Sequence, residues 1–121
     1  FFHKKKNNMR QHFFLLLACL LILHHTHAQS NNEFQGAGTG GNITTGSGNT
    51  MYGDSAGVTQ TSASLTTIVG YQAGYSNNAW DNVFIGYQAG YANTTGNDNV
   101  FIGELAGAAY TTGSDNVFIG D

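Results

Sequence analysis

The feature that most constrains this chain is a repeat with a period of 17 residues. Segment 82–98 reads NVFIGYQAGYANTTGND, segment 99–115 repeats it in register as NVFIGELAGAAYTTGSD, and residue 116 begins another copy. Weaker copies precede them at 49–65 and, one residue shorter, at 66–81. Self-similarity at a fixed period is typical of a solenoid, in which each unit buries its apolar side against its neighbours. We therefore predict that successive units stack as the coils of a solenoid.

Each unit opens with a short apolar segment of β-branched and aromatic residues, which favour strands. The predicted fold is therefore an all-β parallel β-solenoid with 17-residue coils. Successive side chains of a strand point to opposite sides, so Val83 and Ile85 share one side and Phe84 takes the other. One side fills the lumen of the coil. We expect the other side to be an exposed apolar stripe of Phe84, Phe101 and Phe118, and such a stripe favours self-association along the rod.

Two glycines four residues apart, such as Gly86 and Gly90, recur in every unit. Glycine permits the positive φ or close backbone approach that sharp corners need, and Ala89 between them is expected to point inward. The tyrosines beside these glycines are expected to stack from coil to coil, and we interpret them as cross-coil packing rather than as a ligand platform. These tyrosines are Tyr71, Tyr75, Tyr87 and Tyr91.

The end of each unit is rich in residues that form turns. Asn82, Asn99 and Asn116 are expected to form an amide ladder, with one residue per coil about 4.8 Å apart. Asp98, Asp115 and the asparagines that follow them are expected to bond nearby main-chain groups as Asx-turns, and the acids that precede the ladder residues are expected to form a column of like charge. Because Ca²⁺ takes oxygen ligands, this column is the one candidate metal site, and a solvated turn acid is the competing interpretation. The acids are Asp81, Asp98 and Asp115.

Residues 1–28 have the pattern of a secretory signal peptide, with an eleven-residue apolar run at 13–23 and a cleavage site after Ala28. A transmembrane helix needs about 20 apolar residues, so we expect no membrane span. Residues 1–8 precede the expected start at Met9. We therefore predict export through a cleaved signal peptide, to the medium or to the cell surface at the outer membrane.

Residues 29–121 contain all seven acids of the chain and no Lys, Arg, His or Cys. Without these side chains there is no Ser-His or Cys-His nucleophile, no Schiff-base lysine and no imidazole or thiolate ligand for zinc. A wholly acidic surface also repels phosphate backbones. We therefore predict that the protein is not an enzyme, that it needs no cofactor unless calcium binds the acids, and that nucleic acid is not a partner.

We divide the exported part into two regions. Residues 29–48 are rich in Gly, Asn and Thr and form either a flexible segment or an atypical capping coil, of which the coil is favoured. Residues 49–121 are the β-solenoid repeats, and because the sequence stops within a repeat we interpret it as an N-terminal fragment. Trp80 occurs once, in the short unit, and no role is assigned to it.

The NVFIGYQAG core, with its strand ending in Ile-Gly and its small residue shortly after, resembles the head repeats of YadA-like trimeric autotransporter adhesins. It also resembles the NTTG-rich repeats of secreted and tail-fibre proteins that end in an endosialidase-type chaperone. The resemblance covers residues 49–121 well and 32–48 poorly. It implies a left-handed β-roll, a homotrimer, and a surface fibre or adhesin that contacts a host surface or glycan. The period is longer than the family's usual coil, and no stalk, membrane anchor or chaperone is present in the sequence.

Two other classes of function remain as alternatives to a structural and binding segment. Parallel β-helices host polysaccharide-cleaving activities, for which Asp81, Asp98 and Asp115 are the candidate acids, but residues 29–121 contain no basic residue to stabilise an oxyanion. Some Thr-rich solenoids bind ice, but Thr94 and Thr95 are adjacent, so their side chains are expected to diverge. The favoured prediction is an exported fibre or adhesin-type segment without catalysis.

Overall fold

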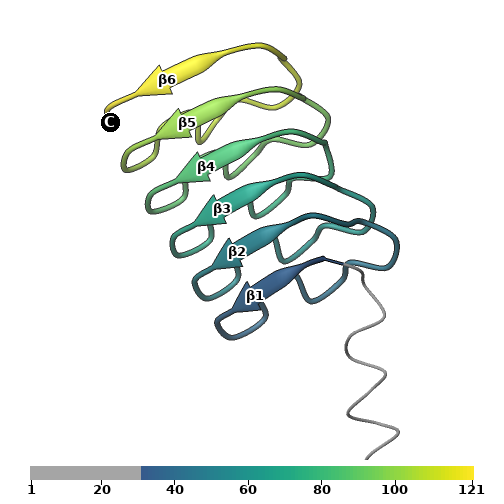
Figure 1. The fold of residues 1–121 in the computed structure, drawn as a ribbon. Helices are drawn as coiled ribbons and strands as arrows, with labels where there is room; N and C mark the ends of the chain where they lie inside the picture. Colours follow the sequence, from purple (N-terminus) through teal and green to yellow (C-terminus); the bar gives the residue numbers. More distant parts are fainter. Residues whose placement is uncertain (1–30) are drawn as a thin grey trace, which may run out of the picture.

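The computed structural model describes residues 31–121, which form a parallel β-solenoid (Figure 1). The predicted all-β fold with 17-residue coils is confirmed: these residues contain six strands in one sheet, and each strand pairs in parallel with the next along the chain. The expected signal peptide lies outside the described residues. The strands are β1 (Glu33–Gln35), β2 (Thr50–Tyr52), β3 (Thr67–Val69), β4 (Val83–Ile85), β5 (Val100–Ile102) and β6 (Val117–Ile119).

The strands stay in register even where one coil is a residue short. Val83 of β4 pairs with Val100, 17 residues on, whereas Thr67 of β3 pairs with Val83, 16 residues on. The one-residue deletion lies in the loop between β3 and Trp80. Beyond that loop the 17-residue offset is restored, because the amide of Trp80 bonds the side chain of Asn97, 17 residues on, at 2.9 Å. The irregularity is therefore absorbed in a turn, and the sheet and the core are not displaced.

The interior is filled by the middle residue of each strand. Phe84 and Phe101 are fully buried, and their rings stack with centroids 5.1 Å apart. The prediction that the phenylalanines form an exposed stripe was therefore wrong. In a three-residue strand only the middle side chain points into the lumen, and enclosing it there contributes about 1.5–3 kcal/mol relative to exposure. The inward set is Phe34, Met51, Ile68, Phe84, Phe101 and Phe118.

The recurring glycines are needed both for conformation and for space. Gly86 has a φ of 138°, and a Cβ on it would overlap the carbonyl oxygen of Gly103 in the next coil. Gly90 has a φ of 62°, and a Cβ there would lie 2.7 Å from the Phe84 ring. The expected inward position of Ala89 is confirmed, since its side chain is fully buried. The glycines thus let coils approach closely while the alanine leaves room for the phenylalanine ring.

The expected amide ladder is confirmed. The Oδ1 of Asn82 accepts a hydrogen bond from the amide of Asn99 at 2.9 Å, and its Nδ2 donates to the carbonyl of Gly96 at 2.8 Å. Asn99 Oδ1 accepts from the amide of Asn116 in the same way, at 3.1 Å. Because Asn82 and Asn99 are buried, these bonds satisfy backbone groups that would otherwise be costly to enclose.

A second buried polar column was not predicted. Asn93 Nδ2 donates to Asn77 Oδ1 at 2.7 Å and to the carbonyl of Gly96 at 2.9 Å. Gln60 occupies the same place one coil before Asn77 and is also fully buried. Neither polar atom of its side chain has a hydrogen-bond partner among the described residues. The column is therefore well satisfied in the later coils and poorly satisfied at Gln60.

Candidate functional site

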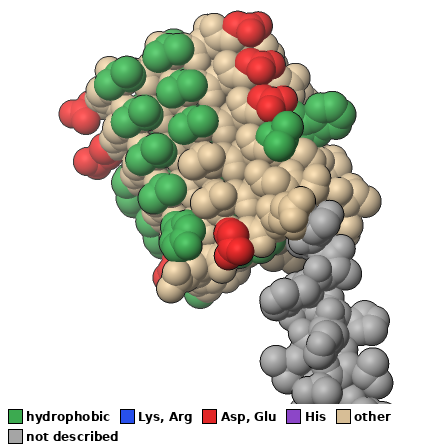
Figure 2. Space-filling view, in the orientation of Figure 1, with side chains coloured by type: hydrophobic (Ala, Val, Ile, Leu, Met, Phe, Trp, Pro, Cys, Tyr) green, Lys and Arg blue, Asp and Glu red, His purple; other side chains and the backbone are tan. Residues whose placement is uncertain are grey.

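The structure places Asp81, Asp98 and Asp115 in one exposed column, along an edge where Figure 2 shows stacked acidic side chains. All three have left-handed backbone, with φ of 56°, 56° and 62°. Leu65 takes the same place one coil earlier with a φ of 59°. Asp tolerates this conformation better than most residues, so the position selects for left-handed backbone rather than for a carboxylate.

The acid column does not converge on a metal site in the structure. Among residues 31–121, no group of three or more His, Cys, Asp or Glu is arranged to hold a metal ion. Each coil supplies one carboxylate, whereas Ca²⁺ takes six to eight oxygen ligands. The expected Asx-turns of Asp98 and Asp115 are not formed, since no hydrogen bond to either carboxylate is present in the described part of the chain. Calcium binding to Asp81, Asp98 and Asp115 stays a prediction.

The outward face of the sheet is aliphatic over its later strands. Val83 and Ile85 flank the buried Phe84, and Ile85 is 36% exposed. The corresponding residues of β1 are Glu33 and Gln35, so the face changes from polar to apolar along the rod. Figure 2 shows the apolar side chains as rows over the strands. This surface, rather than the phenylalanines, is the exposed apolar stripe of the solenoid.

The expected stacking of the tyrosines is confirmed, in two separate columns. The rings of Tyr71 and Tyr87 have centroids 5.8 Å apart and planes 9° apart. Those of Tyr75 and Tyr91 have centroids 4.9 Å apart and planes 18° apart. Both columns come from the loop that follows each strand, in the same two coils. The result is two separate tyrosine columns on the loops that follow β3 and β4.

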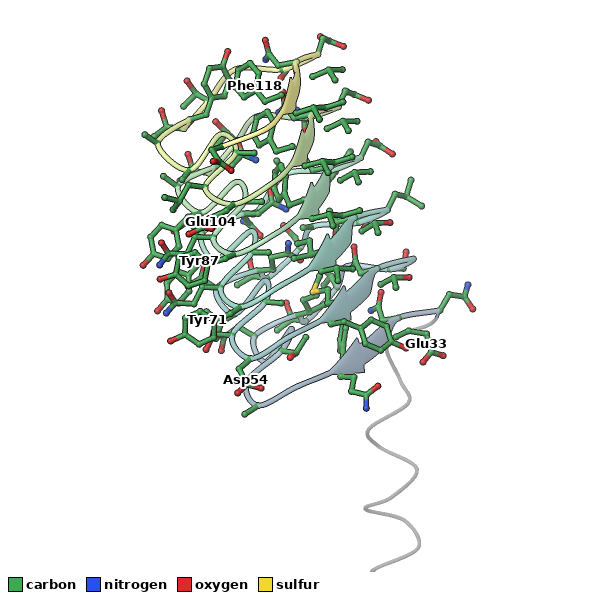
Figure 3. All side chains as sticks on the ribbon, turned by 90° about the vertical axis from the view of Figure 1, so that its left-hand side faces the viewer. Glu33, Asp54, Tyr71, Tyr87, Glu104 and Phe118 are labelled. Atoms are coloured by element: carbon green, nitrogen blue, oxygen red, sulfur yellow. The ribbon has the colours of Figure 1, made fainter. Side chains whose placement is uncertain are left out.

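Two acids flank the column of Tyr71 and Tyr87, and this flanking was not predicted from the sequence. Asp54 holds the position of Tyr71 one coil earlier, and Glu104 holds the position of Tyr87 one coil later. Figure 3 shows Asp54, Tyr71, Tyr87 and Glu104 along one side of the rod. The signal was present in the sequence, because all four residues directly follow the first glycine of their units. Grouping residues by type, rather than by place in the repeat, concealed it. We name these four residues the tyrosine–acid column.

The threonine corner does not form a regular array. Thr94 and Thr95 are both exposed, and both of their amides donate to the carbonyl of Thr111, at 2.8 and 3.4 Å. The Thr94 hydroxyl donates to that same carbonyl at 3.0 Å, so it takes part in coil stacking. The short coil places Asn78 in this column. No continuous threonine face therefore runs along the rod.

No protein-family model matches the chain, and comparisons with curated proteins and with solved structures also gave no match. Within residues 31–121 there is no helix with the length and hydropathy required to cross a membrane. The fold and surface define a parallel β-solenoid with an aliphatic outer sheet face, an acid column and two tyrosine columns.

Proposed function

We propose that this chain is the repeat segment of an exported surface fibre or adhesin-type protein, with a structural and binding role rather than a catalytic one. The observation that carries the proposal is the aliphatic outer face of the sheet, where Ile85 is 36% exposed and Val69 is 37% exposed. Contiguous exposed apolar surface of this kind marks interaction sites on soluble proteins. The resemblance to trimeric adhesin head repeats supports three copies packed around one axis.

A repeated interface suits a fibre because its strength grows with length. Each strand is three residues long, so one coil presents a patch only about 10 Å wide. Neighbouring coils present the same patch about 4.8 Å further along the rod, so contacts between parallel rods add coil by coil. A weak contact per coil thus becomes a stable assembly over many coils.

Catalysis is outside the proposal. Asp81, Asp98 and Asp115 are exposed, and each lies at a turn whose left-handed backbone accounts for the choice of residue. Residues 29–121 contain no Lys, Arg or His side chain that would bind an anionic sugar or stabilise an oxyanion. The ice-binding alternative lacks a continuous threonine face, because Asn78 interrupts it. An adhesive or spacer role requires none of these groups.

Sedimentation velocity of the exported chain tests the assembly. We expect a species of three times the chain mass, and we expect the double variant Ile85→Lys with Ile102→Lys to sediment as a monomer. The control Thr95→Lys with Thr112→Lys adds the same charge at two exposed positions of a different corner and should leave the assembly intact. A monomeric native chain at the highest soluble concentration would contradict the proposal.

The export part of the proposal has its own test. Residues 1–28 carry the pattern of a cleaved leader, so the mature protein recovered from the medium or the cell surface should begin at Gln29. N-terminal sequencing of that protein decides the point. A product that retains residues 13–23 and stays inside the cell would exclude the exported fibre.

A further inference from the structure

We propose that the tyrosine–acid column binds a cationic segment of a partner polypeptide, with one Arg or Lys side chain at each end of the tyrosine pair. This inference rests on the binding role proposed above and not on self-association. The tyrosine–acid column belongs to the loop beyond the strand ends, whereas the aliphatic face lies on the strands themselves (Figure 3).

The stacked pair leaves aromatic surface open at both of its ends. Tyr71 and Tyr87 are 50% and 46% exposed. Their rings are almost parallel, so each covers one face of the other and keeps one face directed along the column. Beyond those faces lie Asp54 in one direction and Glu104 in the other, both exposed. A cation placed at either end would meet a ring face and a carboxylate together, the combination that attracts guanidinium and ammonium groups.

The charge of residues 31–121 indicates that the cations come from another molecule. This part of the chain contains no Lys, Arg or His, so its acids have no ion-pair partner among the described residues. Asp54 accepts one hydrogen bond, from the amide of Ala37 at 2.9 Å, through Oδ1. Its second oxygen and the Glu104 carboxylate make no hydrogen bond in the described part of the chain. A neutral sugar would leave these carboxylates without a counter-charge, which favours a basic peptide as the occupant.

The spacing of the column specifies how the cations are arranged. Asp54 and Glu104 are three coils apart, which at about 4.8 Å per coil corresponds to about 14 Å. An extended peptide advances about 3.4 Å per residue and places residues i and i+4 on the same side, also about 14 Å apart. The column therefore fits an extended segment that runs along the solenoid axis with two cations four residues apart.

Fluorescence anisotropy with two labelled probes of identical composition tests the proposal. One probe, GSRGSGRGS, has its arginines four residues apart, and the other, GSGRRGSGS, has them adjacent. We expect the spaced probe to bind the full chain several-fold more tightly than the adjacent probe at low ionic strength. Equal binding of the two probes, or no binding of either, would overturn the inference.

Matched variants locate the site. Asp54→Asn with Glu104→Gln should weaken binding of the spaced probe about tenfold, since each exposed ion pair contributes up to about 1 kcal/mol. Asn at 54 keeps the acceptor for the Ala37 amide. The control, Asp98→Asn with Asp115→Asn, removes the same charge from the other acid column and should change the affinity less than about twofold. An equal loss of probe affinity in both double variants would show only general charge attraction and would contradict the proposal.

The tyrosines and the class of ligand are tested in the same assay. Tyr71→Leu with Tyr87→Leu should weaken binding several-fold while circular dichroism stays unchanged. Binding of neutral oligosaccharides that survives Asp54→Asn with Glu104→Gln, without binding of the spaced probe, would identify a glycan platform and overturn the cationic partner. A trimer that binds no probe would refute this inference alone, whereas a monomer that binds none would refute the fibre proposal as well.

Discussion

Coils 32–48 and 49–65 share one backbone with coils 82–98 and 99–115, although their side chains differ. The outward residues of β1 are Glu33 and Gln35, while those of β4 are Val83 and Ile85. In both regions the strands pair in parallel with the same 17-residue offset. The coil geometry therefore does not depend on the chemistry of the outer face.

The inner residues differ as well. Met51 fills the lumen of the second coil and Phe101 that of a later one, and both are fully buried. What the two regions share is the first glycine of the unit, with φ of 125° at Gly53 and 138° at Gly86, and the buried asparagine that begins it. The comparison indicates that close backbone approach and hydrogen bonding between coils define the fold, while lumen side chains need only be apolar and of suitable size.

Substitution of the first glycine of a unit should cause the largest loss of stability, and the loss should be equal in the two regions. Gly86→Ala and Gly53→Ala each place a Cβ against the backbone of the next coil, at a φ that side chains rarely adopt. We expect each to lower the free energy of unfolding by about 4 kcal/mol, measured by chemical denaturation. Gly38→Ala is the control for space, because it also has a left-handed φ, 71°, but the nearest atom to its Cβ would be Val58 Cγ2 at 3.8 Å, so it should cost only the conformational penalty of about 1–2 kcal/mol. If Gly53→Ala lowers the free energy of unfolding much less than Gly86→Ala does, the two regions do not share one backbone requirement.

The asparagine ladder should also be equally important in both regions. Asn82→Leu and Asn49→Leu each remove a buried acceptor from the next coil's amide, which is bonded at 2.9 Å in one case and 3.1 Å in the other. We expect each to cost about 2–3 kcal/mol, because the amide is left buried and unpaired. Thermal and chemical denaturation measure the loss. The exposed Asn42→Leu is the control, and a comparable loss there would argue against the importance of burial.

Substitutions in the second polar column should change the free energy of unfolding in opposite directions in the two regions. Gln60→Met replaces a buried amide that lacks partners with an apolar side chain of similar size, and should stabilise the protein by about 1–2 kcal/mol. Asn93→Leu removes an amide that bonds Asn77 and Gly96, and should destabilise it by about 2 kcal/mol. Denaturation midpoints of the two variants make the comparison. Destabilisation by Gln60→Met would show that Gln60 is satisfied in solution.

A smaller effect is expected where leucine and aspartate share one backbone conformation. Leu65 has a φ of 59° and Asp98 a φ of 56°, and non-glycine residues other than Asn and Asp pay about 1–2 kcal/mol in this region. Leu65→Asn should therefore raise the free energy of unfolding by up to about 1 kcal/mol, and Asp98→Leu should lower it by a similar amount. Thermal melts suffice as the measurement. If both variants destabilise the protein, local packing rather than backbone conformation sets the choice at this position.

The smallest effect should be that of calcium, since the acid column exists only in the later coils. Gly48 and Leu65 occupy the column in the earlier region, followed by Asp81. A solvated column predicts no change in Tm when Ca²⁺ is added. A bound ion would stabilise the fold by about 2.7 kcal/mol at a concentration one hundred times its dissociation constant. A Tm increase that Asp98→Asn abolishes would establish the calcium site instead.

The period was enough to predict the parallel coils and the asparagine ladder, because residues one period apart must stack in a solenoid. It could not show which side of the strand faces inward. Val83, Phe84 and Ile85 are all apolar, so alternation of polarity, which normally identifies the buried side, was absent. The packing of the Phe84 ring beside the small Ala89 resolved the ambiguity.

The linear order of residues was thus sufficient for the repeat, the strand positions and the glycine corners, since these depend on contacts between identical places in successive coils. The three-dimensional arrangement was needed to assign the inward face and the isolation of Gln60. Those features depend on the volume of the lumen and on neighbours at the corners, and both are set by how the coils close rather than by the repeat pattern.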